Sequence, residues 1–154
     1  SPADKLNQLQ KQVVDPVNVQ ERAAMCFGVI SLNTDSSPQN SVMITKGEKI
    51  PCSKTESFYT VADGQTGVNI RITESRGPET DPNFVSILKE DYLKLPSGRP
   101  AGQEIKVTYS FDDSQKQHCE FVDVATGEKT TVIINKTDSK ASKPADPTKV
   151  FTVE

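Results

Sequence analysis

No stretch of the sequence contains 18 consecutive apolar residues, and a membrane-spanning helix needs about that many. The sequence also lacks a basic cluster, because its 18 Lys and Arg are spread among 21 Asp and Glu for a net charge of −3. Nucleic-acid phosphates are bound by clustered Lys and Arg. The first five residues, Ser1 to Lys5, contain no hydrophobic signal core. We therefore expect neither a membrane nor a nucleic acid among the partners.

Catalytic and metal-binding patterns are also missing. The one histidine, His118, precedes Cys119, and neighbouring strand residues point to opposite faces, so the two side chains are not expected to share a metal or form a nucleophile–base pair. No glycine-rich phosphate loop is present, and the carboxylates are scattered among predicted loops. The sequence predicts a binding protein without a catalytic site, metal or cofactor in this segment.

The three cysteines, Cys26, Cys52 and Cys119, are an odd number without close spacing. This pattern is typical of free buried thiols in a reducing compartment, and it favours a cytoplasmic location. The triplet Asn135-Lys136-Thr137 is a glycosylation acceptor motif, which leaves the endoplasmic reticulum open as an alternative.

Three segments are predicted along the chain. Residues 1–24 form a short helix and a linker, because Leu6, Leu9 and Val13 have helical spacing and Pro16 ends that pattern. Residues 25–136 form the folded domain. Residues 137–154 form a flexible tail rich in Lys, Ser, Pro and Asp.

Residues 25–136 alternate between apolar and polar positions with period two, most clearly at Val68 to Thr73 and Glu104 to Phe111. A polar loop is expected at 33–40, around Pro38. About eight short strands separated by turn signals predict an all-β fold, an antiparallel β-sandwich. The predicted strands cover residues 25–32, 41–46, 54–61, 68–73, 84–88, 104–111, 117–124 and 129–135.

Five short segments, in the same order, resemble the substrate-binding β-domain of the 70-kDa heat-shock (DnaK-type) chaperones. The resemblance covers residues 25–135 and includes an Ile-Pro step and a strand that begins at Phe58 and is followed by an Asp-Gly-Gln turn. No single motif is specific to the family, but five of them occur at compatible spacings. The segments are Phe27-Gly28-Val29, Lys49-Ile50-Pro51, Phe58 to Ile70, Gly102 to Asp112 and Asp123 to Lys129.

The resemblance implies a channel that holds short extended hydrophobic segments of unfolded proteins. Carried over by position, Val68 forms the floor of its central pocket. The walls of the pocket are formed by Phe58, Ile70, Val29 and Ile50. Leu32 and Val61 form an arch over the peptide, and Ser31 is a small polar wall residue.

The same resemblance implies a role in protein folding and the stress response, J-domain co-chaperones as partners, and ATP bound only by an N-terminal domain of a parent chain. The apolar run Val150 to Val153 follows a flexible tether and is itself a candidate ligand of the channel. Two alternatives remain open: a structural or adhesion β-sandwich that recognises folded proteins, and a degenerate family member that acts as a scaffold.

Overall fold

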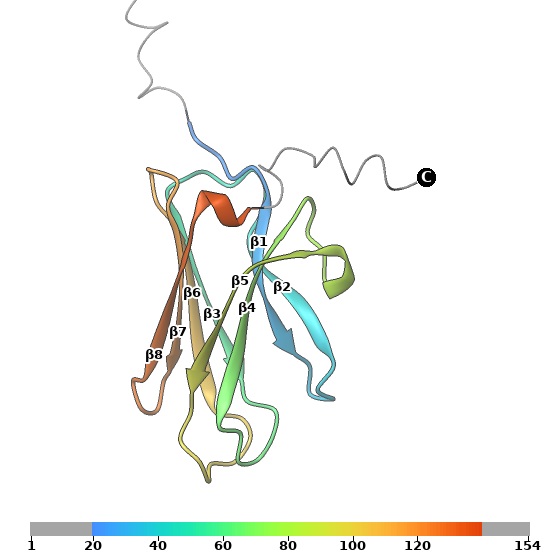
Figure 1. The fold of residues 1–154 in the computed structure, drawn as a ribbon, viewed down its shortest axis with the longest axis vertical. Coiled ribbons are helices and arrows are strands. Elements are labelled where there is room, and N and C mark those ends of the chain that lie inside the picture. The colour runs from blue at the N-terminus through green and yellow to red at the C-terminus, as the bar shows by residue number, and fades with distance from the viewer. Residues whose placement is uncertain (1–19, 140–154) are drawn as a thin grey trace, which may run out of the picture.

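The computed structural model describes residues 20–139, which form eight strands in two four-stranded antiparallel sheets (Figure 1). The strand order is β2-β1-β4-β5 in one sheet and β3-β6-β7-β8 in the other. The predicted antiparallel β-sandwich is therefore confirmed. The strands are β1 (Cys26–Leu32), β2 (Pro38–Ile44), β3 (Cys52–Tyr59), β4 (Gly67–Ser75), β5 (Ser86–Lys94), β6 (Glu104–Phe111), β7 (Gln117–Asp123) and β8 (Lys129–Ile134).

The core lies between the sheets and follows from the alternation in the sequence. Every second residue of β6 is buried, namely Ile105, Val107, Tyr109 and Phe111. They belong to one hydrophobic cluster with residues of the opposite sheet such as Ile72 of β4. Each such apolar side chain contributes about 1.5–3 kcal/mol when it is buried.

The largest differences from the predicted strand bounds are in β2 and β5. Strand β2 begins at Pro38, inside the segment expected to be a loop, because a proline at the first position of an edge strand costs no ladder hydrogen bond. Strand β5 continues to Lys94, beyond the expected end at residue 88. Its second half is mostly polar and exposed, apart from the buried Leu93.

The described ends of the chain lie against the sandwich. Ala23 is buried, and its backbone exchanges hydrogen bonds with Gly47 and Glu48. At the other end, Lys136–Asp138 forms a 3-10 turn, and the Ser139 hydroxyl donates to Glu74. The helix predicted within residues 3–14 and the apolar run 150–153 lie outside the described residues.

Strand β3 carries charged side chains on its inward-facing side. Lys54 and Glu56 stand opposite the buried Tyr109 and Val107 of β6, and directly opposed residues share a face of a sheet. Both charged residues are exposed, and Lys54 forms an ion pair with Glu48 at 3.5 Å. The edge of this sheet is therefore charged where the same face of the neighbouring strand is apolar.

Gly28 lies at a β-bulge between β1 and β2, where the register shifts between Phe27 and Gly28. A Cβ atom at this position would collide with the backbone carbonyl oxygen of Ser41. We expect Gly28→Ala to lower the free energy of unfolding by about 1–3 kcal/mol, because the backbone must shift to make room. Urea denaturation measures this effect. Gly77→Ala is the control, since a Cβ there meets nothing within 4 Å, and an equal loss in both variants would contradict the prediction.

The cysteines and the histidine make no cluster within residues 20–139. Cys26 and Cys119 are free and buried, and Cys52 is free and half-buried. Burial raises the pKa of the Cys119 thiol to about 12. The described part of the chain holds no group of three or more His, Cys, Asp or Glu side chains suited to a metal ion. It also has no helix long and apolar enough to span a bilayer.

Candidate functional site

Strands β1 and β4 pair along only part of their length. Their register runs from Cys26↔Ser75 to Val29↔Ile72 and ends there. Beyond that point β1 stays paired with β2, and β4 stays paired with β5 as far as Gly67. Figure 1 shows β1 and β2 diverging from β4 in this region. Beyond Val29 and Ile72, the facing backbone edges of β1 and β4 are consequently not paired with each other.

Two β-bulges explain where the strands diverge. One lies between Phe27 and Gly28 on the β1–β2 ladder, and the other between Ile72 and Thr73 on the β4–β5 ladder. Both adjoin the last β1–β4 pair. The extra residue is Met43 of β2 in the first bulge and Leu88 of β5 in the second. A bulge bends the strand that carries the extra residue and increases the local twist, so the outer strand of each pair bends at the level where β1 and β4 separate.

A cleft of about 210 Å³ occupies the space that this divergence opens. An apolar cavity of about 150 Å³ already accommodates a benzene-sized ligand, so the cleft has room for one aliphatic or aromatic side chain. It is lined by Val29, Ile30, Ser31, Leu32, Phe58, Tyr59, Thr60, Val61, Gln65, Gly67, Val68, Asn69, Arg71, Ile105, Val107 and Phe121.

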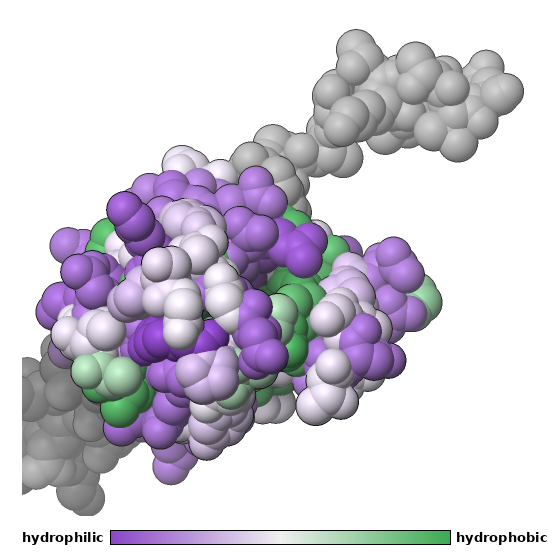
Figure 2. All heavy atoms as spheres, turned by 90° about the horizontal axis from the view of Figure 1, so that it is seen from below, coloured by the Kyte–Doolittle hydropathy of each residue, from purple (hydrophilic) through white to green (hydrophobic). Residues whose placement is uncertain are grey.

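The floor of the cleft is continuous with the core. Ile105, Val107 and Phe121 are buried and belong to the core cluster. Phe58 and Val68 are half-buried and pack between this floor and solvent. Figure 2 views the molecule from below the orientation of Figure 1 and shows hydrophobic residues inside a hollow between polar flanks. An apolar side chain entering the cleft would meet carbon atoms from both sheets.

The rim of the cleft combines exposed apolar surface with one charge. Leu32 is 46% exposed and Tyr59 is 58% exposed, which is high for large hydrophobic side chains. Within the described residues, Arg71 is the only charged residue that lines the cleft. Exposed apolar surface beside an apolar cavity is typical of a binding site rather than of a bare sandwich edge.

Residues 60–67 form a loop beside the cleft that is held by its own side chains. The Gln65 amide donates to the Gly67 carbonyl at 2.9 Å, and its oxygen accepts from the Val61 backbone N–H at 3.1 Å. The Thr60 hydroxyl accepts from the Gln103 backbone N–H at 3.0 Å. These bonds fix three cleft-lining residues, Thr60, Val61 and Gly67, in position.

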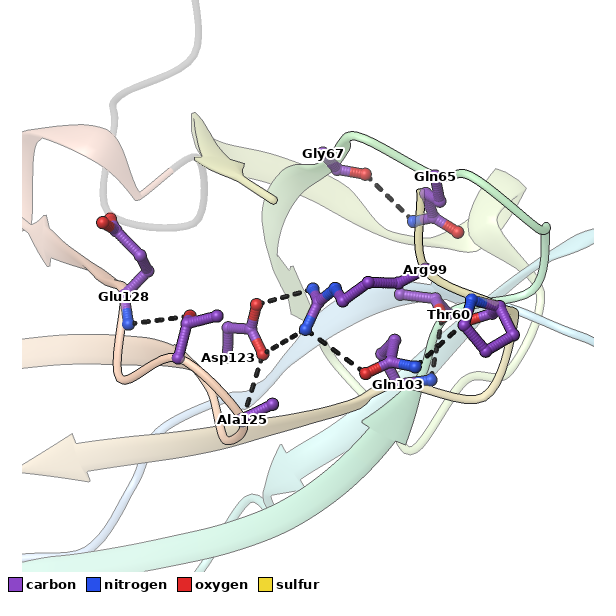
Figure 3. A network of polar contacts seen from close by, with 10 residues as sticks. Thr60, Gln65, Gly67, Arg99, Gln103, Asp123, Ala125 and Glu128 are labelled. Carbon is purple, nitrogen blue, oxygen red and sulfur yellow. Dashed lines mark hydrogen bonds and ion pairs between the residues drawn. The ribbon is translucent and has the colours of Figure 1, made fainter. Parts of the chain in front are cut away.

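A buried ion pair supports this loop from below (Figure 3). The Arg99 guanidinium donates to both oxygens of Asp123, at 2.6 Å and 3.2 Å, and to the Gln103 side-chain oxygen at 3.2 Å. The Asp123 side chain has no exposed surface. The hydrogen bonds from Arg99 hold the pKa of the Asp123 carboxyl below its ordinary value. The Arg99 carbonyl also accepts from the Gly64 N–H, which connects the pair to the 60–67 loop.

The structure brings most of the predicted site residues to this one cleft. Val68, Phe58, Val29, Leu32, Val61 and Ser31 all line it. Ile70 is buried in the core behind it and is not among the lining residues. Ile50 is buried at the other end of β3, near the Arg22↔Lys49 bridge. The Ser31 hydroxyl is hydrogen-bonded to Ser41 at 2.8 Å.

Other residues of the cleft were not predicted from the sequence. Alternation places Asn69 and Arg71 on the polar face of β4, where they look like ordinary solvent-facing residues. They line the cleft because β1 turns away from this part of β4. Tyr59, which follows Phe58 on the opposite face of β3, also lines the cleft. The apolar–polar alternation within a strand does not indicate whether that strand separates from its neighbour in the sheet.

Comparisons with known proteins find no matching family model. The chain is 29% identical to the chaperone protein DnaK of Thermotoga petrophila over 93 residues, and 30% identical to that of Thermosipho melanesiensis over 95 residues. It is 27% identical over 101 residues to heat shock 70 kDa protein 2 of Paracoccidioides lutzii. These matches cover 60–66% of the chain but only 15% of each relative's length. The similarity is distant and partial, and it relates the chain to the 70-kDa heat-shock chaperones.

Proposed function

We propose that this domain holds short, extended, hydrophobic segments of unfolded polypeptides in the cleft between β1 and β4. The observation that carries the proposal is the opening of the sheet at an apolar cleft. An extended peptide offers backbone donors and acceptors to the unpaired strand edges, and this mode of recognition depends little on sequence. One apolar side chain of the peptide enters the cleft beside Val68. The distant similarity to chaperones supports the same role.

The expected affinity is modest. One buried aliphatic side chain contributes about 1.5–3 kcal/mol, and each net hydrogen bond about 1 kcal/mol. Ordering a flexible peptide offsets part of this gain. We expect dissociation constants on the order of micromolar.

Fluorescence anisotropy with a labelled heptapeptide centred on Leu tests the proposal. We expect saturable binding, and weaker binding by about tenfold or more when the central Leu is replaced by Gly. Equal binding of both peptides, or no saturation, would contradict it. A thermal-shift screen with folded proteins and unstructured peptides separates this role from that of an adhesion module, because only a peptide holder is stabilised by the peptides.

The segment Val150 to Val153 has the composition of a ligand for this cleft. Ser139 lies beside Glu74, at the end of β4 away from the cleft, and the 10 residues between Ser139 and Val150 can span up to about 36 Å. A tethered segment competes at a high effective concentration. We expect deletion of residues 146–154 to raise the affinity for added peptide about twofold to tenfold, measured by the same anisotropy titration. Replacement of residues 140–145 by a Gly/Ser sequence of equal length, which keeps both the apolar run and the length of the tether, is the control; unchanged affinity in the 146–154 deletion would refute self-occupancy.

The wider context of the domain is also part of the proposal. Coupling to an ATP-binding domain and to J-domain co-chaperones would require chain outside the 154 residues. We place the protein in the cytoplasm, where three free thiols persist.

A further inference from the structure

The charge of the cleft indicates which peptide segments the cleft prefers. Of the side chains that line the cleft in the described part of the chain, only Arg71 is charged, and no carboxylate is among them. A cleft that must bind an extended chain therefore presents one positive group next to its apolar floor.

Arg71 is available to a ligand. Within residues 20–139 its guanidinium makes neither a hydrogen bond nor an ion pair with another residue, and its side chain is half-exposed. Its neighbour across the strand pair is Glu90 of β5. Glu90 stands on the side of β4 away from β1, and no ion pair within 4.0 Å joins the two. The positive charge is thus partly screened but not neutralised.

The position of Arg71 along β4 also matters. It lies three residues from Val68 on the same strand, which is about 10 Å along an extended chain. A peptide running beside β4 with an aliphatic residue at Val68 places the residue three positions away from that aliphatic residue level with Arg71. A carboxylate there gains Coulomb attraction, whereas an ammonium is repelled.

We infer that the cleft selects extended segments in which the central aliphatic residue is flanked by acidic residues, and that Arg71 is the residue that reads this charge. The inference rests on the proposed function, because it concerns a preference among peptides that bind in the cleft. The apolar floor supplies most of the affinity, and Arg71 discriminates among flanking residues.

The experiment compares three Leu-centred heptapeptides in which the first and last residues, three positions from Leu on either side, are Glu, Gln or Lys. At low ionic strength we expect the Glu peptide to bind about threefold to fivefold more tightly than the Gln peptide, and the Lys peptide to bind most weakly. The difference should shrink as salt is added. In Arg71→Gln the three peptides should bind with the same affinity as one another.

Arg76→Gln is the matched control, because it removes one positive charge at the other end of β4, beside a separate cavity. It should keep the preference for Glu. Equal binding of the three peptides to the wild-type protein, or a preference that survives in Arg71→Gln, would overturn the role of Arg71 while leaving peptide binding intact. Failure of all three peptides to bind would instead overturn the proposed function, and this inference with it.

Discussion

Val68→Phe is expected to abolish the binding of hydrophobic peptides while the domain remains folded. Val68 is half-buried, lines the cleft and packs against the core cluster from its solvent side. A phenyl ring at this position occupies the space that a ligand side chain would fill. Losing that burial removes about 1.5–3 kcal/mol of binding free energy, and steric exclusion adds to the loss. We expect the dissociation constant of a Leu-centred heptapeptide to rise at least tenfold.

Two measurements separate loss of the cleft from loss of the fold. Circular dichroism and the thermal midpoint of Val68→Phe should stay close to the wild-type values. Val122→Phe places the same enlargement on β7, where Val122 is half-buried and does not line the cleft, and it should leave peptide affinity unchanged. Wild-type affinity in a folded Val68→Phe protein would show that peptides bind elsewhere.

Arg99→Ala is expected to cause a large loss of stability. Asp123 has no exposed surface, and the guanidinium of Arg99 contacts both of its oxygens. Removing Arg99 leaves a buried carboxylate that keeps hydrogen bonds only from the Ala125 N–H and the Thr126 side chain. Such a change costs about 3–5 kcal/mol, which urea denaturation at pH 7 would measure. Lys129→Ala is the control, because its pair with Glu120 is exposed and 4.0 Å long, and it should cost less than about 1 kcal/mol.

The pH dependence gives a second test of the same pair. The pKa of Asp123 is lowered in the folded protein, so its contribution to stability is complete above the unfolded value of about 3.9 and is lost as the pH falls through the lower folded value. Without Arg99, burial raises that pKa, and protonation relieves the unpaired charge. The stability difference between wild type and Arg99→Ala should therefore narrow below about pH 4. A constant difference from pH 7 to pH 3 would mean that the carboxylate charge is not the cause.

Much of the fold could be predicted from the sequence, because its alternation is a direct record of which residues face the core. Strand β6 has the predicted bounds, and its four inward residues are all buried. The edge strands were harder. The charged half of β5 does not continue the alternation of its first half, because the extra residue Leu88 at the register shift changes which positions face the core.

The cleft was predicted less completely than the fold. The family resemblance pointed to Val68 and Phe58, which do line it, and to Ile50, which lies elsewhere. Arg71 was missed because its exposure to the cleft depends on the divergence of β1 from β4. That divergence begins at the level of two bulges in the outer strands β2 and β5, and the pattern of apolar residues in β1 and β4 does not record them.

The inward-facing charges of β3 have a consequence for how such a protein behaves in concentrated solution. A molecule with open strand edges in its cleft risks joining copies of itself into long β-structured aggregates. Lys54 and Glu56 would have to be stripped of water before a second sheet could add along β3, and that dehydration opposes assembly. The molecule can thus bind other polypeptides in its cleft while the edge strand β3 resists self-association.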